Sequence, residues 1–316
     1  MARPTSRPAI PDAPMSRAAV TSERRPLAVS LLVSLRPGQW TKNLVVFAGL
    51  LFSLQLFEPR AIITAVEAFV IFCALSGIVY LINDVMDRES DRRHPTKSLR
   101  PIAAGELPVP VALGAAAVIG AIAITAAFTL GVRFGALAAG YVALQAFYSG
   151  PLKHIVIIDV LSIAIGFVMR AVAGAVVLDV VISHWLFVCT ILLALFIALA
   201  KRRHELVLLA DDATSHRPIL GEYSAYLLDQ MIAVVTASTL IAYIFYTISP
   251  ETEQKFGTSW LGLTIPFPLY GIFRYLYLVH KRELGGSPAD LFHDLLDIDR
   301  VGTDVEVSHG QGTNGW

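Results

Sequence analysis

Three carboxylates and one amide stand at regular spacing where a long apolar stretch of the sequence ends. Asn83, Asp84, Asp87 and Asp91 follow the spacing N-D-x-x-D-x-x-x-D. On a continuous helix, positions 84, 87 and 91 would share one face, so the three carboxylates would lie close together. Such a group needs a cation, and hard oxygen ligands suit Mg²⁺, which completes its shell with water and phosphate oxygens. The spacing predicts a catalytic Mg²⁺ site at Asp84, Asp87 and Asp91, with Asn83 orienting a carboxylate or ligand oxygen.

Basic residues follow these carboxylates directly. Arg93, Lys97 and Arg100 carry charges that can pair with phosphate oxygens, and arginine can do so through two parallel hydrogen bonds. A solvated helix end of mixed charge is the alternative explanation, and in a soluble protein it would be preferred. Here the motif ends an apolar segment, so we expect a phosphate-binding site.

The elements that position these residues are expected to lie in a membrane. Hydrophobic residues make up 55% of the 316 residues and charged residues only 16%, and the mean hydropathy is +0.62. A soluble domain of this size would carry more charge. Cys73 and Cys189 both lie in apolar runs, so we interpret them as packing residues and expect neither a disulfide framework nor a zinc site.

Eight apolar segments approach the length that a bilayer core requires. They are residues 43–57, 61–82, 109–130, 132–148, 155–178, 184–200, 226–248 and 259–279. The sequence thus predicts an all-α membrane protein with a transmembrane catalytic domain at 26–282. Residues 1–25, rich in Pro, Arg and Ser, are expected to form a disordered cytosolic tail, and residues 283–316 a polar C-terminal tail.

Alternate connections between the spans concentrate the positive charge. The rich set comprises Arg88, Arg92, Arg93, Lys97, Arg100, Lys153, Lys201, Arg202, Arg203, Arg217, Lys281 and Arg282, whereas the other connections hold Arg60, Arg133 and Lys255. By the positive-inside rule the rich set is cytoplasmic, together with the Arg-rich N-terminus. We therefore expect a multi-pass protein of the plasma membrane whose N-terminus and active site face the cytoplasm.

Further polar residues lie inside spans or at their cytoplasmic ends. Besides Arg93, Lys97 and Arg100, we expect substrate-binding roles for Lys42, Asn43, Tyr148, Lys153, Asp159, Arg170, Lys201 and Arg202, and a catalytic role for Glu205. Ionisable residues in a span usually pair or face a polar cavity, so structural ion pairs are the alternative for Asp159 and Arg170. Lys201 and Glu205 would share a helix face, and a positive-inside anchor is the alternative there.

The first motif, N-D-x-x-D-x-x-x-D at a span end, resembles that of the UbiA superfamily of intramembrane prenyltransferases. The resemblance covers about residues 30–280 and includes a second polar motif after the sixth span. It implies a bundle of eight to nine transmembrane helices around a central cavity open to the cytosol, with Asp motifs that bind diphosphate through Mg²⁺. The family usually has nine spans, and no apolar run after His280 supplies the ninth.

Three segments indicate which members of the superfamily this chain resembles. Where aromatic prenyltransferases carry a second D-x-x-x-D, this chain has K-R-R-H-E-L; it also has L-R-P-G-Q-W-T-K-N and D-R-R-H-P-T-K-S-L-R-P-I-A-A-G. This combination resembles the decaprenyl-phosphate phosphoribosyltransferases of mycobacterial-type cell-wall arabinan (arabinogalactan) synthesis. Phosphoribosyl diphosphate and a lipid phosphate together bring more negative charge than a prenyl diphosphate with a neutral acceptor. Replacing carboxylates by Lys201 and Arg202 matches that difference.

The resemblance implies a Mg²⁺-dependent transfer of 5-phosphoribosyl from 5-phosphoribosyl 1-diphosphate to decaprenyl (polyprenyl) phosphate, with release of diphosphate. The implied partners are these two substrates and the lipid bilayer, and no nucleic acid is implied. The resemblance allows a homo-oligomer but does not specify one. Two alternatives stay open. One is an aromatic or quinone prenyltransferase of the same family. The other is a transporter, which should show inverted repeats that this sequence does not display.

Overall fold

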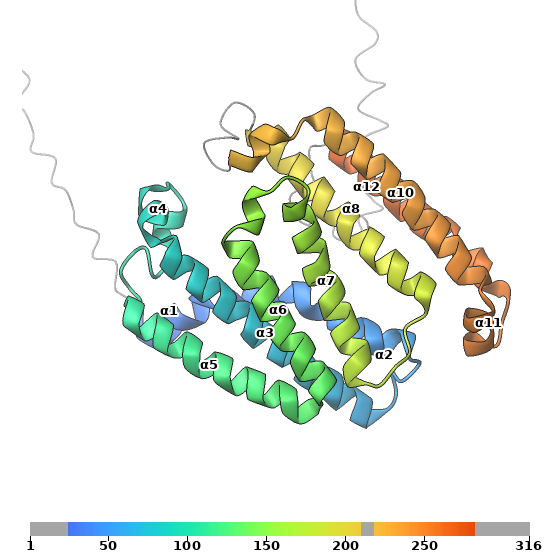
Figure 1. The fold of residues 1–316 in the computed structure, drawn as a ribbon, viewed down its shortest axis with the longest axis horizontal. Coiled ribbons are helices and arrows are strands. Elements are labelled where there is room, and N and C mark those ends of the chain that lie inside the picture. Colours follow the sequence, from blue (N-terminus) through green and yellow to red (C-terminus); the bar gives the residue numbers. More distant parts are fainter. Residues whose placement is uncertain (1–24, 210–217, 282–316) are drawn as a thin grey trace, which may run out of the picture.

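The computed structural model describes residues 25–209 and 218–281 (Figure 1). Residues 1–24 of the predicted tail at 1–25, the predicted tail at 283–316, and Arg217 and Arg282 lie outside the described residues. Within the described ranges the regular structure is helical, as predicted. The α-helices are α1 (Leu27–Ser34), α2 (Ala48–Phe52), α3 (Pro59–Met86), α4 (Arg88–Arg93), α5 (Val109–Leu130), α6 (Val132–Ser149), α7 (Ile158–Val177), α8 (His184–Leu209), α10 (Ala225–Ile248), α11 (Pro250–Phe256) and α12 (Pro266–Lys281).

Short 3₁₀-helices join several of these elements. They are η1 (Pro37–Phe47), η2 (Lys97–Leu99), η3 (Leu152–His154), η5 (Pro218–Glu222) and η6 (Trp260–Thr264). The longest, η1, lies against both α3 and α7. It therefore brings residues from near the start of the described chain into the middle of the bundle.

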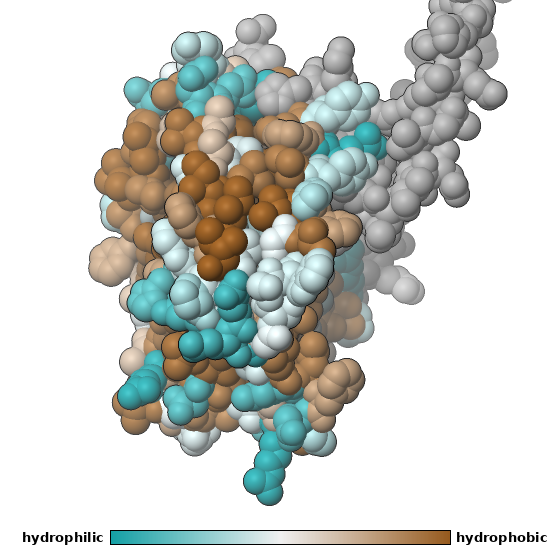
Figure 2. All heavy atoms as spheres, turned by 90° about the vertical axis from the view of Figure 1, so that its right-hand side faces the viewer, coloured by the Kyte–Doolittle hydropathy of each residue, from teal (hydrophilic) through white to brown (hydrophobic). Residues whose placement is uncertain are grey.

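Five helices of the described chain, α3, α5, α7, α8 and α10, are long and apolar enough to cross a membrane. They coincide with five of the eight predicted spans. Two other predicted spans fall on α6, which has 18 residues including Arg133 and Gln145, and on α12, which has 16 residues. Figure 2 shows apolar side chains over much of one outer face, interrupted by a band of more polar residues, and the apolar areas are those expected to contact lipid tails.

The predicted first span, residues 43–57, is not one helix. Its residues form the end of η1, the short helix α2 and an irregular segment that leads to α3. Arg36, which precedes η1, has a left-handed φ of 54°, and Pro37 and Gly38 follow it. The chain turns at this point, and η1 then packs against α3 and α7 through the buried Asn43 and Val46, while Leu44 on its other side is 53% exposed.

Helix α7 connects two separate hydrophobic cores. One core lies among α3, α5 and α6 and includes Ala173 from the C-terminal half of α7. The other lies among α8, α10 and α12 and includes Val160 from its N-terminal half. Figure 1 shows α7 between the two groups of helices. The ionisable residues of α7, Asp159 and Arg170, are therefore placed at the junction of the two cores.

Two glycines let η1 and α2 approach α7 at backbone distance. A Cβ atom at Gly174 would lie 1.8 Å from the carbonyl oxygen of Val46, and one at Gly49 would lie 2.4 Å from the carbonyl carbon of Gly174. Gly174 is one helical turn beyond Arg170 on α7, so the two residues share a face. The glycine contact thus fixes η1 against the part of α7 that carries Arg170.

We expect Gly174→Ala to destabilise the protein by about 1–3 kcal/mol or more, because the new methyl group would overlap backbone atoms that cannot rotate away. The matched control is Gly114→Ala on the exposed side of α5, where an added Cβ meets nothing within 4 Å. Alanine at an exposed helical position is neutral or slightly stabilising. Thermal unfolding in detergent measures both variants, and equal melting temperatures would contradict the close contact.

Candidate functional site

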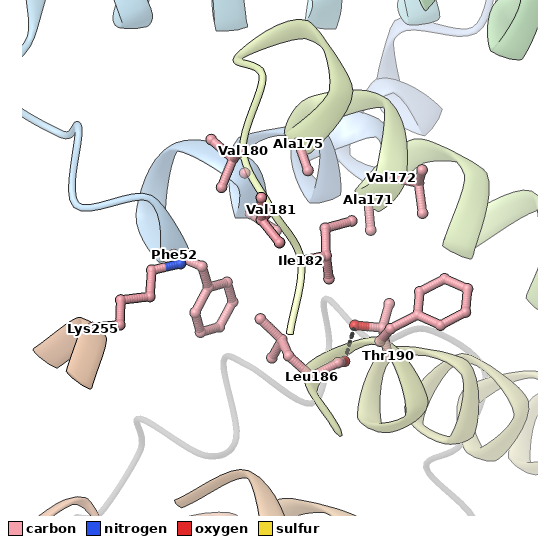
Figure 3. Close-up of a pocket in the computed structure, with 13 residues that line it drawn as sticks. Phe52, Ala171, Val172, Ala175, Val180, Val181, Ile182, Leu186, Thr190 and Lys255 are labelled. Atoms are coloured by element: carbon pink, nitrogen blue, oxygen red, sulfur yellow. Dashed lines mark hydrogen bonds between the residues drawn. The ribbon is translucent and has the colours of Figure 1, made fainter. Parts of the chain in front are cut away.

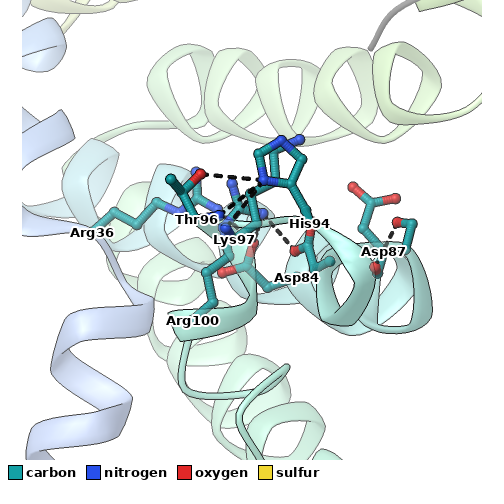
Figure 4. A network of polar contacts seen from close by, with 9 residues as sticks. Arg36, Asp84, Asp87, His94, Thr96, Lys97 and Arg100 are labelled. Carbon is teal, nitrogen blue, oxygen red and sulfur yellow. Dashed lines mark hydrogen bonds and ion pairs between the residues drawn. The ribbon is translucent and has the colours of Figure 1, made fainter. Parts of the chain in front are cut away.

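Two buried carboxylates share one arginine at the end of α3. Nη1 of Arg100 lies 3.1 Å from Oδ1 of Asp84 and 2.6 Å from Oδ2 of Asp91, and both aspartates are 3% exposed. Nη2 of Arg36 lies 2.5 Å from the same Oδ1 of Asp84. Figure 4 shows the two arginines approaching Asp84 from different segments of the chain. Buried carboxylates are costly unless paired, and here Arg36 and Arg100 provide the pairing, whereas the sequence predicted Mg²⁺ at these carboxylates.

The predicted common helix face of the three aspartates is interrupted. Helix α3 ends at Met86, Asp87 is its C-terminal cap, and the short helix α4 begins at Arg88. Asp87 is exposed and points away from Arg100 (Figure 4). The structure thus brings together Asp84 and Asp91 on Arg100, but not Asp87. Asn83 is half-buried in the last turn of α3.

Two of the three predicted carboxylates, those of Asp84 and Asp91, fit a Mg²⁺ ion in donor type and spacing, whereas Asp87 does not join them. A single nitrogen contacts Asp84 and Asp91, so one cation can reach both carboxylates. Over residues 25–209 and 218–281, no group of three His, Cys, Asp or Glu side chains is close enough to hold a metal. Mg²⁺ normally takes one or two carboxylates and completes its shell with water and substrate phosphate. Asp84 and Asp91 meet that requirement, and the further ligands would come from the substrate.

The other basic residues near α4 lie at the surface. Arg93 and Lys97 are exposed, in α4 and η2 respectively. Nδ1 of His94 accepts hydrogen bonds from the backbone N–H groups of Thr96 and Lys97, at 3.2 and 3.3 Å. These bonds fix the turn between α4 and η2, which in turn places Arg100 beside the aspartates.

The second polar motif forms a chain of ion pairs between α7 and α8. Nη2 of Arg202 lies 2.7 Å from Oδ2 of Asp159, and its Nη1 lies 2.5 Å from Oε2 of Glu205. Oε1 of Glu205 is 3.8 Å from Nζ of Lys201. Asp159 is 0% exposed and Arg202 2%, so these two are enclosed in the protein. Lys201, by contrast, is exposed beside Glu205 and is the member of this chain that a substrate can approach.

Sequence reasoning did not identify Tyr223, which completes this chain. Its hydroxyl donates to Oδ1 of Asp159 at 2.7 Å and accepts from the backbone N–H of Ile157 at 2.7 Å. Burial, with a contribution from the Asp159 hydrogen bond, raises the pKa of Tyr223 to about 12, so the phenol stays protonated. Nothing in the local sequence distinguishes Tyr223, because its role depends on residues more than 60 positions away.

Arg170 lies in a separate buried network. Its Nε donates to Oδ1 of Asn43 at 2.7 Å, its Nη1 to the carbonyl oxygen of Gly166 at 2.8 Å, and its Nη2 to the hydroxyl of Tyr141 at 2.6 Å. The amide of Asn43 in turn donates to Oγ of Ser76 at 3.1 Å. This network joins η1, α3, α6 and α7 at one point.

Lys42 stands where positive charges from three elements converge. Its pKa is lowered to about 8, first by burial and then by the charges of Lys201 on α8, Arg170 on α7 and Arg36 at the start of η1. Of the other predicted residues, Tyr148 is at the end of α6 and Lys153 is in η3. Lys42 is therefore near enough to Lys201, Arg170 and Arg36 for their charges to lower its pKa, whereas Arg93 and Lys97 are exposed.

Two pockets lie away from these charges. The first is lined by Ala48 and Gly49 from α2, by Ala171, Val172 and Ala175 from α7, by Leu186 and Thr190 from α8, and by Lys255 from α11 (Figure 3). The second shares Val180, Val181, Leu186 and Lys255 with it. Both are near the C-terminal end of α7, whereas Asp159 is at its N-terminal end. We place the functional site on the paired charges, because several cations and carboxylates meet there, whereas Lys255 is the one basic residue among the described residues that line either pocket.

We expect Tyr223→Phe to lower stability by about 1–3 kcal/mol, because Asp159 would lose a donor and the Ile157 N–H its acceptor. Tyr243→Phe is the matched control: it removes one hydroxyl that bonds Thr264 at 2.7 Å, away from the ion-pair chain. Thermal unfolding compares the two. A Tyr223→Phe protein at least as stable as the Tyr243→Phe protein would show that the hydroxyl does not support the chain.

We expect the amine of Lys42 to react with an amine-modifying reagent with a midpoint near pH 8, against 10.5 for an unperturbed lysine. Only the neutral amine reacts, and a lowered pKa makes the neutral form available at lower pH. Removing a neighbouring charge by Arg36→Gln should move the midpoint upwards. Mass spectrometry of the labelled peptide follows the rate, and a midpoint near 10.5 in the unmodified protein would contradict the charge cluster.

The chain is similar to known proteins over most of its length. The chain is 34% identical over 270 residues to a decaprenyl-phosphate phosphoribosyltransferase of Corynebacterium glutamicum, covering 84% of this chain and 81% of that protein. It is 32% identical over 276 residues to the protein of that name from Mycolicibacterium smegmatis, covering 84% and 86%. Both relatives are matched over most of their length.

Solved structures share the fold. A UbiA homologue from Archaeoglobus fulgidus, bound to GPP and Mg²⁺, superposes with a TM-score of 0.65 at 17% identity, covering 84% of this chain and 93% of that one. A digeranylgeranylglyceryl phosphate synthase gives a TM-score of 0.61 at 18% identity, covering 85% and 93%. The UbiA prenyltransferase family matches residues 43–294. The chain belongs to the UbiA prenyltransferase family and is a multi-pass membrane transferase.

Proposed function

We propose that this transferase moves 5-phosphoribosyl from 5-phosphoribosyl 1-diphosphate to a polyprenyl phosphate, with decaprenyl phosphate as the expected acceptor, and releases diphosphate. The reaction would supply a precursor of cell-wall arabinan. The observation that carries the proposal is the buried Arg170, whose hydrogen-bond partners are all uncharged, with Lys42, Lys201 and Arg36 near enough for their charges to interact. A donor with two phosphate groups and an anionic acceptor match such a site better than a neutral aromatic acceptor does. The names of the relatives support the same substrates.

Asp84 and Asp91 would hold Mg²⁺ on the diphosphate, with Asp87 reaching it through a movement of α4 and Asn83 orienting a ligand oxygen. Bound there, the metal would neutralise charge that develops on the departing diphosphate. Arg36 and Arg100, now held by the aspartates, are the nearest guanidinium groups for the diphosphate oxygens.

The chain's own groups would do the remaining work by position and charge. As the C1–O bond of ribose breaks, C1 gains positive character and the leaving oxygen gains negative charge, which the arginines stabilise. The acceptor phosphate is already anionic, so its oxygen attacks C1 without a general base. Glu205, fixed by Arg202, holds Lys201 at the entrance for a phosphate. Because the attacking phosphate oxygen carries no proton, no proton has to be removed during the transfer.

The proposed substrate set has an inner and an outer group. Lys42, Asn43 and Arg170 are the inner residues, and Arg100 lies with Arg36 at the diphosphate. Lys201, Arg93, Lys97, Tyr148 and Lys153 are expected to guide the donor at the rim. Asp159 and Arg202 act through Glu205, because the Arg202 guanidinium is already paired with both carboxylates. We also propose that this site faces the cytoplasm, where the water-soluble donor is made.

The test is transfer of labelled phosphoribosyl to decaprenyl phosphate in sealed membrane vesicles. Inverted vesicles, which expose the cytoplasmic face, should form product in the presence of Mg²⁺, and right-side-out vesicles should not, because the charged donor cannot cross the bilayer. Asp84→Asn should lower the rate at least a hundredfold, the scale of losing a key charge contact in a transition state. The control Asp179→Asn changes a 97% exposed carboxylate elsewhere.

Two results would contradict the proposal. If inverted vesicles instead join a prenyl diphosphate to an aromatic acceptor and ignore the phosphoribosyl donor, the chain is an aromatic prenyltransferase. If Asp84→Asn and Asp179→Asn have equal, near-normal rates, the carboxylate site is not where the reaction occurs.

A further inference from the structure

Arg170 is a buried cation without a carboxylate partner in the part of the chain that the structure describes. It is 5% exposed, and its hydrogen-bond partners, Asn43, Gly166 and Tyr141, are all uncharged. The arginines of the other two networks each contact at least one carboxylate. A buried charge is costly to leave unpaired, so a site that retains one is expected to receive an opposite charge from elsewhere.

The hydrogen-bond inventory of Arg170 leaves donors available. A guanidinium group has five N–H bonds, one on Nε and two on each Nη. The bonds to Asn43, Gly166 and Tyr141 use one hydrogen on each nitrogen. One N–H on Nη1 and one on Nη2 therefore have no acceptor among the described residues. Two such donors on one planar group have the geometry that binds two oxygens of a phosphate.

The guanidinium plane is held in a fixed orientation. It stacks on Tyr141, with 4.7 Å between its carbon and the ring centroid, and on Phe167 at 5.4 Å. Asn43 fixes Nε, and Asn43 is itself 0% exposed and bonded to Ser76. A ligand would thus meet a donor pair that is already ordered, which lowers the entropy cost of binding.

Charge balance around Lys42 indicates the charge of the ligand. We count the cations whose charges act on Lys42, together with all groups that are joined to those cations by ion pairs. The cations are Arg36, Lys42, Arg100, Arg170, Lys201 and Arg202. The carboxylates are those of Asp84, Asp91, Asp159 and Glu205. Six cations against four carboxylates leave a net charge of +2. The two cations of this set without a carboxylate partner in the described chain are Lys42 and Arg170. A phosphate monoester, with up to two negative charges, matches them.

This region is separate from the carboxylate site. Asn43, which bonds Arg170, also bonds Ser76, and Ser76 precedes Asp84 by eight residues on α3. Eight residues of α-helix rise about 12 Å. A group bound at Arg170 would therefore lie deeper in the bundle than one bound at Asp84 and Asp91.

We infer that Arg170 and Lys42, positioned by Asn43, form a subsite for a phosphate monoester, distinct from the diphosphate subsite at Asp84 and Asp91. This assignment rests on the proposed function for its two sources of ligand. The monoester is either the 5-phosphate of the donor sugar or the headgroup of the acceptor lipid. Both offer the same terminal phosphate oxygens to the same donors.

Binding to the detergent-solubilised full chain tests the assignment with three probes: ribose 5-phosphate, farnesyl phosphate, and inorganic diphosphate with Mg²⁺. Arg170→Gln should weaken at least one monoester roughly ten- to a hundredfold, the range for a charge-assisted contact. Lys42→Gln, at a half-buried position that disturbs packing less, should weaken the same probe. Diphosphate binding should stay within about twofold of the unmodified chain. The control Arg133→Gln changes an 87% exposed side chain at the start of α6.

The probes separate the two sources. Selective weakening of ribose 5-phosphate assigns the subsite to the donor, and selective weakening of farnesyl phosphate assigns it to the acceptor. Unchanged affinity for both monoesters in Arg170→Gln and Lys42→Gln would overturn the subsite, as would a parallel loss of diphosphate binding. A monoester that binds at Arg170 in a chain without phosphoribosyl transfer would instead refute the proposed reaction and leave the subsite in place.

Discussion

The pairing of buried carboxylates with arginines is the constraint on which the rest of this structure depends. Asp84 and Asp91 can be buried at the end of α3 only because Arg100 and Arg36 neutralise them. Arg36 precedes η1 and Arg100 follows η2, so one ion-pair network fixes the start of the described chain against the α4 region. Breaking it would leave uncompensated charge in a low-dielectric environment and would release both segments.

Helix α7 also places buried charged residues at defined positions in the bundle. Its N-terminal end holds Asp159, which is neutralised by Arg202, and its middle holds Arg170, which contacts no carboxylate in the described chain. The glycine contact at Gly174 then presses η1 onto the helix one turn beyond Arg170. Carboxylates thus lie at the ends of the helices and a surplus of positive charge lies between them, an arrangement suited to a substrate with several phosphate groups.

The sequence predicted the helical class and most of the long helices, because apolar length and turn residues are local properties. It also identified Asp84, Asp91, Arg170 and Lys201 as residues of interest. It wrongly predicted one span at 43–57, because it could not show that η1 packs on α7 through glycines far away in the chain. It also placed Asp87 beside Asp84, since a helix break at position 87 has no Gly or Pro signal.

Residues whose roles depend on distant partners were the hardest to predict. Arg202 was expected to bind substrate, but it is enclosed between Asp159 and Glu205, and Tyr223 was not identified at all. A basic residue at a span end has the same local signature whether it meets a substrate or a buried carboxylate. Only the three-dimensional arrangement distinguishes Lys42 and Arg170 from Arg202.

The most direct measurement is an experimental structure of the full chain with Mg²⁺ and the phosphoribosyl donor bound. The account predicts the diphosphate and its metal at Asp84 and Asp91, with Arg36 or Arg100 turned from a carboxylate towards a phosphate oxygen. Donor diphosphate bound elsewhere, with the contacts of Arg36 and Arg100 to Asp84 and Asp91 intact, would contradict the account.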